Sequence, residues 1–235
     1  MLNARKNYSS MLTKILCTGV LALIISIVVM AQSQNGKVDF FYFVKIGTQE
    51  WMSRDLNVVH YRNGDTIPEA RSEEEWKSYG KAGKGCWCYY NNDSTNGLKY
   101  GKLYNGYAVM DPRGLAPLGW HIPNDGEWGI LRYSINGYYT EYPFGTIAES
   151  DELKATGEWK YDKNISNKSG FTALPNGQRN FNGKFRYMGR NGYWWCLRMY
   201  RPYQLGIESL NATSGLILYG NEKKTKGFAV RCVKD

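Results

Sequence analysis

The chain has 235 residues and a formal net charge of +9, with 30 basic and 21 acidic side chains. Apart from Lys223–Lys226, the basic residues are scattered, which indicates a solvated surface and argues against a nucleic-acid partner. The two histidines are too few for a histidine cluster that could hold iron.

The N-terminal segment has the composition of an export signal. Basic residues Arg5, Lys6 and Lys14 precede an uncharged apolar run over residues 15–30. This run is about 16 residues long, shorter than the roughly 20 that span a bilayer comfortably. We therefore expect cleavage after Ala31, with an uncleaved membrane anchor as the alternative. The protein would then act at the cell surface, in the periplasm or outside the cell.

The remaining chain has no Pro/Ser-rich linker and no charge block that would divide it. Its length suits one domain. Removing the three basic residues of the signal leaves 27 basic and 21 acidic side chains, a net charge of +6. The expected organisation is a signal peptide at residues 1–31, a short extension at 32–43 and one domain at 44–235.

Four cysteines follow the predicted signal: Cys86, Cys88, Cys196 and Cys232. An even number in an exported protein predicts disulfides, and three pairings are possible. A bridge between the first two would close a very tight ring. The favoured scheme joins Cys88 to Cys232 and Cys86 to Cys196. Zinc ligation is the alternative, although paired zinc ligands usually have two or more residues between them.

Short strands and few helices are expected, because glycine and aromatic residues recur at short intervals. One helix begins near Ser72, and a second begins at Asn124, where Glu127 completes a capping box. A weaker helix is predicted over residues 147–156. Strands are predicted at residues 44–46 and 50–52 as a hairpin, and at 86–90, 103–109, 193–199, 215–219 and 227–233.

The order of short motifs along the chain resembles one known family. The motifs are VKIGTQEWM at 44–52, DLNV at 55–58, HYRNGD at 60–65, YGKLYN at 100–105, GWHIP at 119–123, SGFTALP at 169–175, GYWW at 192–195 and GFAVRCV at 227–233. This order resembles the Fibrobacter succinogenes major paralogous domain, a family of exported proteins abundant in Bacteroidetes and fibre-degrading bacteria. The resemblance covers residues 44–235.

That family is related to C-type-lectin-like domains of the branch that includes the formylglycine-generating enzymes. The resemblance therefore implies an α+β fold, with a small twisted antiparallel sheet, two or three helices and long loops. It does not imply an activity, because a fold hosts many functions.

No catalytic residue, metal or cofactor is predicted. A formylglycine-generating enzyme needs its active-site cysteine pair, and a related sulfoxide synthase needs a histidine cluster, and the sequence shows neither. His60 and His121 lie in different motifs, and a structural hydrogen-bonding role is expected for His121. The acidic residues Glu50, Asp55, Glu127 and Glu158 show no spacing that would pair two of them for glycoside hydrolysis.

The calcium motifs of sugar-binding C-type lectins are also missing from the sequence. The oxygen-rich run Asn91–Asp93 offers ligands that calcium accepts. Such a run directly after a strand is more often a turn, and we interpret it as one.

Nineteen tyrosines and eight tryptophans exceed the needs of one core and suggest a recognition surface. The predicted ligand-binding residues are Trp195, Arg198, Tyr200, Arg201 and Tyr203, where aromatic and guanidinium groups alternate. Alternatively, Trp195 belongs to the hydrophobic core and the other four residues lie in an ordinary loop.

The leading hypothesis is an exported, non-catalytic binding or adhesion module for a polysaccharide or protein. An enzyme or enzyme accessory of the formylglycine-generating branch is one alternative. A structural surface component is the other.

Overall fold

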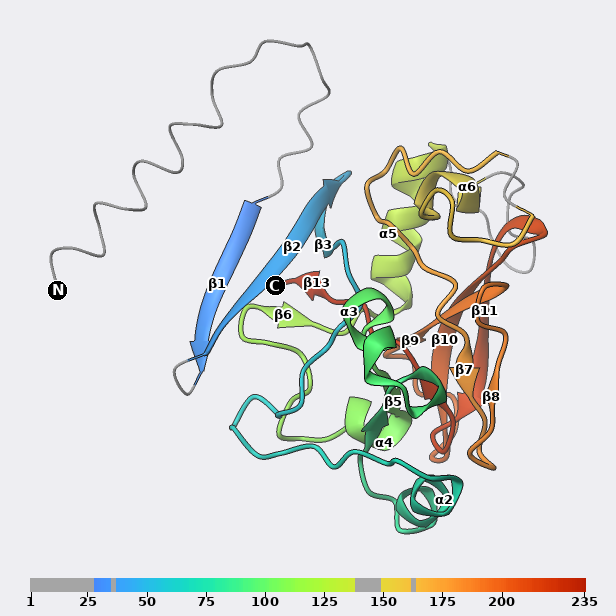
Figure 1. Cartoon of the computed structure of the whole chain (residues 1–235). Coiled ribbons are helices and arrows are strands. Elements are labelled where there is room, and N and C mark those ends of the chain that lie inside the picture. Colours follow the sequence, from blue (N-terminus) through green and yellow to red (C-terminus); the bar gives the residue numbers. More distant parts are fainter. Residues whose placement is uncertain (1–27, 35–36, 138–148, 162–163) are drawn as a thin grey trace, which may run out of the picture.

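The computed structural model describes residues 28–34, 37–137, 149–161 and 164–235 (Figure 1). Its helices are α2 (Glu73–Lys81), α3 (Gly97–Tyr100), α4 (Gly106–Val109), α5 (Asp125–Asn136) and α6 (Glu149–Leu153), with 3-10 turns η1 (Tyr90–Asn92) and η2 (Ser94–Asn96). Its strands are β1 (Val28–Gln34), β2 (Lys37–Ile46), β3 (Gln49–Met52), β4 (Trp87–Cys88), β5 (Leu103–Asn105), β6 (Trp120–His121), β7 (Gln178–Arg179), β8 (Phe185–Arg186), β9 (Asn191–Cys196), β10 (Gln204–Asn211), β11 (Ser214–Lys223), β12 (Gly227–Phe228) and β13 (Val233–Lys234).

The described strands form three antiparallel sheets with few short helices, so the α+β class is confirmed. The strand orders are β1-β2-β3-β13-β6, β4-β5-β12-β7-β8 and β11-β10-β9. The expectation of one small sheet is wrong, because the described strands pair in three separate ladders. Figure 1 shows α5 between the sheet that holds β2 and the sheet that holds β10.

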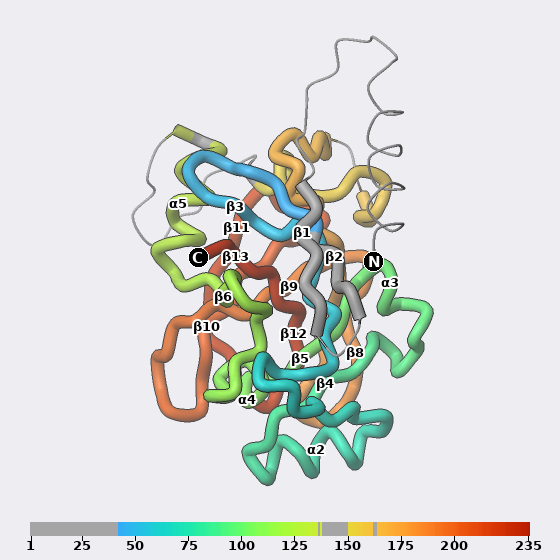
Figure 2. Tube along the Cα trace, turned by 90° about the vertical axis from the view of Figure 1, so that its left-hand side faces the viewer, coloured from blue at the N-terminus to red at the C-terminus, as the bar shows by residue number. Residues whose placement is uncertain are grey.

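The C-terminal segment, residues 227–234, joins all three sheets. β12 pairs with β5 and β7, and β13 pairs with β3 and β6. Between them, an isolated bridge joins Ala229 to Trp194 of the third sheet. Residues 227–233 are all buried, as their apolar alternation predicted. The single strand predicted there is instead two short strands, because its two ends pair with different sheets. The segment runs through the middle of the molecule in Figure 2.

The other strand predictions have mixed outcomes. The hairpin is confirmed, with Lys45 opposite Glu50 and Gly47 at a φ of 58° in its turn. The strand expected at 103–109 ends early, because the Asn105 side chain accepts a hydrogen bond from the Ala108 amide and starts α4. β10 was missed, although it is the central strand of its sheet.

Both well-specified helices begin where their capping residues predict. Ser72 accepts a hydrogen bond from the Glu75 amide at the start of α2. Asn124 and Glu127 form the predicted capping box of α5, whose Trp128 is buried in the core. The third helix is shorter than expected within the described ranges, where α6 covers five residues. Residues 147–148 of the predicted helix lie outside those ranges.

The export-signal prediction is not tested, since residues 1–27 lie outside the described ranges. Ala31 lies in β1, opposite Phe40 of β2, so cleavage after it would leave Gln32–Gln34 of this strand. No helix of the described residues has the length and apolar character needed to cross a membrane.

A buried ion pair lies where the sheets meet. Asp55 and Arg231 have side chains with 0% exposure, and Arg231 Nε donates to Asp55 Oδ1 at 2.8 Å. The Trp194 indole donates to the same oxygen at 2.8 Å, and Asn176 Nδ2 donates to Asp55 Oδ2 at 2.9 Å. The guanidinium also lies 4.5 Å from the ring centroid of Phe171. Such a buried pair is stable only with this additional hydrogen bonding.

We expect the D55N variant to be strongly destabilised. The amide leaves the Arg231 charge buried without its counter-ion, which costs roughly 3–5 kcal/mol of unfolding free energy. Urea denaturation monitored by tryptophan fluorescence measures the loss. The control is D65N, because Asp65 pairs with Arg113 at 3.0 Å on the exposed surface and should matter little. Equal losses in the two variants would contradict this role of the buried pair.

Candidate ligand-binding loop and the ion network beneath it

The loop between β9 and β10, residues 197–203, exposes an unusual amount of apolar surface. Met199 is 63% exposed, Tyr200 62%, Tyr203 51% and Leu197 38%. These are four of the exposed large hydrophobic residues of the described chain, within seven positions. A concentration of this kind is a feature of recognition surfaces.

Three of the predicted ligand-binding residues lie together on this loop. Arg201 Nη1 donates to Tyr203 Oη at 3.0 Å. The same guanidinium lies 5.4 Å from the ring centroid of Tyr200. The two rings and the cation therefore form one exposed cluster in which each side chain restrains the next, which reduces the entropy lost on binding.

Backbone hydrogen bonds fix both ends of the loop. The Gly206 amide donates to the Arg198 carbonyl at 2.8 Å across the base. At the other end, the Lys224 amide donates to the Tyr203 carbonyl at 3.0 Å. The loop thus projects from a rigid two-strand support, as precise binding sites require.

The other two predicted residues face inward. Trp195 has 0% exposure, its indole donates to the Tyr104 carbonyl at 2.7 Å, and its ring lies 4.7 Å from Phe228. It belongs to the core, as do all eight tryptophans of the chain. The prediction that Trp195 contacts a ligand is therefore corrected, and tyrosines supply most of the exposed aromatic surface of the described chain.

Arg198 anchors the loop internally. Its Nη1 donates to both carboxylate oxygens of Asp125, at 2.8 Å each, and its Nη2 donates to the Gly220 carbonyl at 2.7 Å. Its guanidinium also lies 5.3 Å from the Tyr219 ring. These contacts engage most of its donors, so Arg198 positions the loop while Tyr200 and Arg201 remain exposed.

An ion network lies beneath the base of the loop. Asp125 begins α5, Cys196 ends β9, and Glu208 lies in the middle of β10 with 1% exposure. Cys196 Sγ donates to Asp125 Oδ1 at 3.3 Å, and Arg132 donates to Glu208 Oε2 at 2.8 Å. The network ties α5 to the sheet that carries the loop.

The ligand atoms of Asp125, Cys196 and Glu208 lie within 4.8 Å of one another, a spacing that a metal ion could use. Two features disfavour an ion there. Arg198 and Arg132 already neutralise the two carboxylates. Burial also raises the pKa of Cys196, which keeps the sulfur a neutral thiol. The donor set fits an ion-pair network better than a metal centre.

Glu208 should make stability depend on pH. Burial raises its pKa from 4.5 to about 7, and Arg132 only partly opposes this. An acid with a raised folded-state pKa contributes stability that is fully present below its unfolded pKa and is lost as pH rises through about 7. Between about pH 5 and about pH 8, the unfolding free energy should fall by roughly 2–3 kcal/mol more than in E208Q. Urea denaturation of both proteins measures this, and parallel pH profiles would contradict it.

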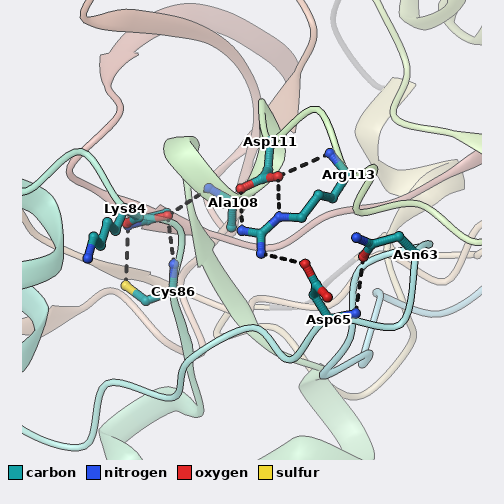
Figure 3. A network of polar contacts seen from close by, with 8 residues as sticks. Asn63, Asp65, Lys84, Cys86, Ala108, Asp111 and Arg113 are labelled. Carbon is teal, nitrogen blue, oxygen red and sulfur yellow. Dashed lines mark hydrogen bonds and ion pairs between the residues drawn. The ribbon is translucent and has the colours of Figure 1, made fainter.

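The predicted disulfides are not formed. All four cysteines of the described chain are free and buried. Cys86 and Cys88 lie in one apolar cluster, whereas Cys196 and Cys232 lie in two others, so neither predicted pair comes together. Cys86 is held separately: Asn105 donates to its sulfur at 3.2 Å and accepts from its amide at 3.1 Å. Figure 3 shows these contacts at Cys86, beside the surface network of Asp65, Asp111 and Arg113.

The carboxylates weighed as catalytic candidates each face a basic side chain. The pairs are Glu50 with Lys234, Asp55 with Arg231, Glu127 with His121, and Glu158 with Lys99. His121 also contacts Asp235 at 2.7 Å, so it links α5 to the C-terminus, the structural role predicted for it. Its burial lowers its pKa, but the two carboxylates more than offset this, and the net shift is upward.

The run Asn91–Asp93 forms the predicted turn. Asn91 and Asn92 have φ values of 57° and 56°, which asparagine tolerates better than most residues. Asp93 Oδ1 accepts from the Thr95 amide at 2.9 Å, so it caps the next turn.

These features define a mixed α+β domain whose three antiparallel sheets are joined by a buried C-terminal segment and whose exposed chemistry lies on loops. Residues 44–234 match the Fibrobacter succinogenes major domain (Fib_succ_major), and the chain belongs to that family. The predicted resemblance is confirmed. Comparison with curated proteins finds no match, and neither does comparison with solved structures.

Proposed function

We propose that this protein is an exported, non-catalytic binding or adhesion module, with a C-type-lectin-like fold, that recognises a polysaccharide or protein outside the cytoplasm. The exposed cluster of Tyr200, Arg201 and Tyr203 is the observation that carries the proposal. Tyrosine and arginine are over-represented among residues that dominate binding energy. The aromatic faces suit sugar rings or apolar side chains, and the guanidinium suits hydroxyls or carboxylates.

The support beneath the loop favours binding over a purely structural role. A loop that served only to connect β9 and β10 would need neither four exposed apolar side chains nor an arginine anchored through Asp125. Exposing such groups to water has a solubility cost that a binding function offsets. Export is supported by the signal-like N-terminus.

We expect the Y200A/R201A double variant to lose ligand binding and keep its stability. Both side chains are exposed, so their removal leaves the core intact. Truncating two central contacts should weaken binding at least about tenfold. The measurement is binding to an array of plant, host and microbial glycans, followed by titration of the best ligand, with the melting temperature measured in parallel.

The matched control is Y161A, which removes another tyrosine that is 67% exposed but lies outside the loop. It should bind like the unmodified protein. Equal weakening by the control, or a large fall in melting temperature in the double variant, would contradict the proposal. If no glycan on the array bound, a protein would remain as the ligand class. If the unmodified protein then captured no protein partner either, a structural surface component would be favoured.

A further inference from the structure

A groove of about 650 Å³ lies away from the loop, where five chain segments meet. Its walls come from Tyr42 of β2, from the residues after β3, from α3, from residues 155–158 after α6, and from residues 167–174. Figure 2 shows α3 and the chain after α6 on the same side of the molecule. The volume lies within the range of small-molecule and cofactor sites.

Arg54 is the main cation of this groove. Its guanidinium lies 4.7 Å from the ring centroid of Tyr42, a cation–π contact that restrains the side chain. Within the described residues, no carboxylate or carbonyl accepts a hydrogen bond from its side chain. Its planar set of N–H donors is therefore preorganised and available, the arrangement that binds a carboxylate in bidentate fashion.

The rest of the lining suits a hydroxyl-rich ligand. Lys99 of α3 pairs with Glu158, so the groove offers a donor and an acceptor side by side. Ser53 and Thr156 add hydroxyl groups, and the 87% exposed Leu98 adds an apolar edge. Saccharides combine hydroxyls with apolar C–H faces. A peptide would be expected to need deeper apolar pockets or a free strand edge.

One wall is held in a strained conformation. Thr172 has a φ of 57°, which a β-branched residue rarely adopts. Asn167 maintains it: Oδ1 accepts from the Thr172 amide at 2.9 Å, and Nδ2 donates to Oγ1 at 3.1 Å. Strain of this kind persists where the surrounding structure fixes a loop, often beside a ligand.

We propose that this groove is a second ligand site, specific for a saccharide that carries a carboxylate, such as a uronate residue. Arg54 pairs with the carboxylate, Lys99 and Glu158 bind ring hydroxyls, and Leu98 contacts an apolar sugar face. The excess of positive charge over the domain, 27 basic against 21 acidic residues after the predicted signal, favours the approach of an acidic polymer. The site extends the proposed binding function without using the loop at 197–203.

The test is calorimetric titration of the full chain with trigalacturonate and with its fully methyl-esterified form. The unmodified protein should bind the acid at least about tenfold more tightly than the ester, because the ester removes the carboxylate. R54Q should bind the acid only as tightly as the unmodified protein binds the ester, and its affinity for the ester should not change. R71Q, which removes an exposed arginine outside the groove, should bind as the unmodified protein does.

Three results would overturn the proposal: no binding of trigalacturonate, equal binding by R54Q, or equal Arg54-dependent binding of hexaglutamate, which would assign the groove to acidic peptides. The Y200A/R201A variant separates the two sites. It should keep trigalacturonate binding. If this variant instead lost trigalacturonate binding while R54Q kept it, the ligand would be assigned to the loop. If trigalacturonate fails while loop-dependent glycan binding persists, the groove proposal alone is wrong.

Discussion

The buried pair between Asp55 and Arg231 is the constraint on which the rest of the structure depends. Two charges with no exposed side-chain surface carry a desolvation penalty of several kcal/mol each. The protein offsets it by surrounding the pair with partners from distant segments: Asn176, Trp194 and the carbonyl of Met52. Each partner must arrive in place for the pair to be satisfied. The pair therefore favours one arrangement of the three sheets and the C-terminal segment that joins them.

Local features of the fold could be predicted from the sequence, and long-range pairing could not. Ser72 and Asn124 mark helix starts because a cap depends on residues three positions apart. The strand at 227–233 was correctly expected to be buried, but no local pattern shows that its two ends join different sheets. β10 was missed because Gly206 and Glu208 interrupt its apolar pattern, although both are buried by contacts that form only in the folded chain.

The candidate sites were predictable to a similar extent. The composition of residues 198–203 indicated an exposed aromatic and cationic surface, and Tyr200 and Arg201 are exposed. Trp195 was misassigned because β9 buries both of its faces near its end, which an alternating pattern does not anticipate. The disulfide prediction rested on the even number of cysteines and on the expected export of the protein, and neither indicates which cysteines are neighbours in the fold. The groove was missed because Tyr42, Lys99 and Glu158 come from separate segments with no shared motif.

The groove and the buried pair are physically continuous. Arg54 immediately precedes Asp55, and Thr172 immediately follows Phe171, whose carbonyl accepts a hydrogen bond from Arg231. These two groove residues are thus each one peptide bond from a residue that contacts Arg231, so the interior fixes where their backbones lie. The loop at 197–203 has a different support, because Asp125 and Arg198 anchor it through α5. Its exposed side chains can therefore change without disturbing the core, whereas the backbone of the groove cannot shift without straining the pair that holds the sheets together.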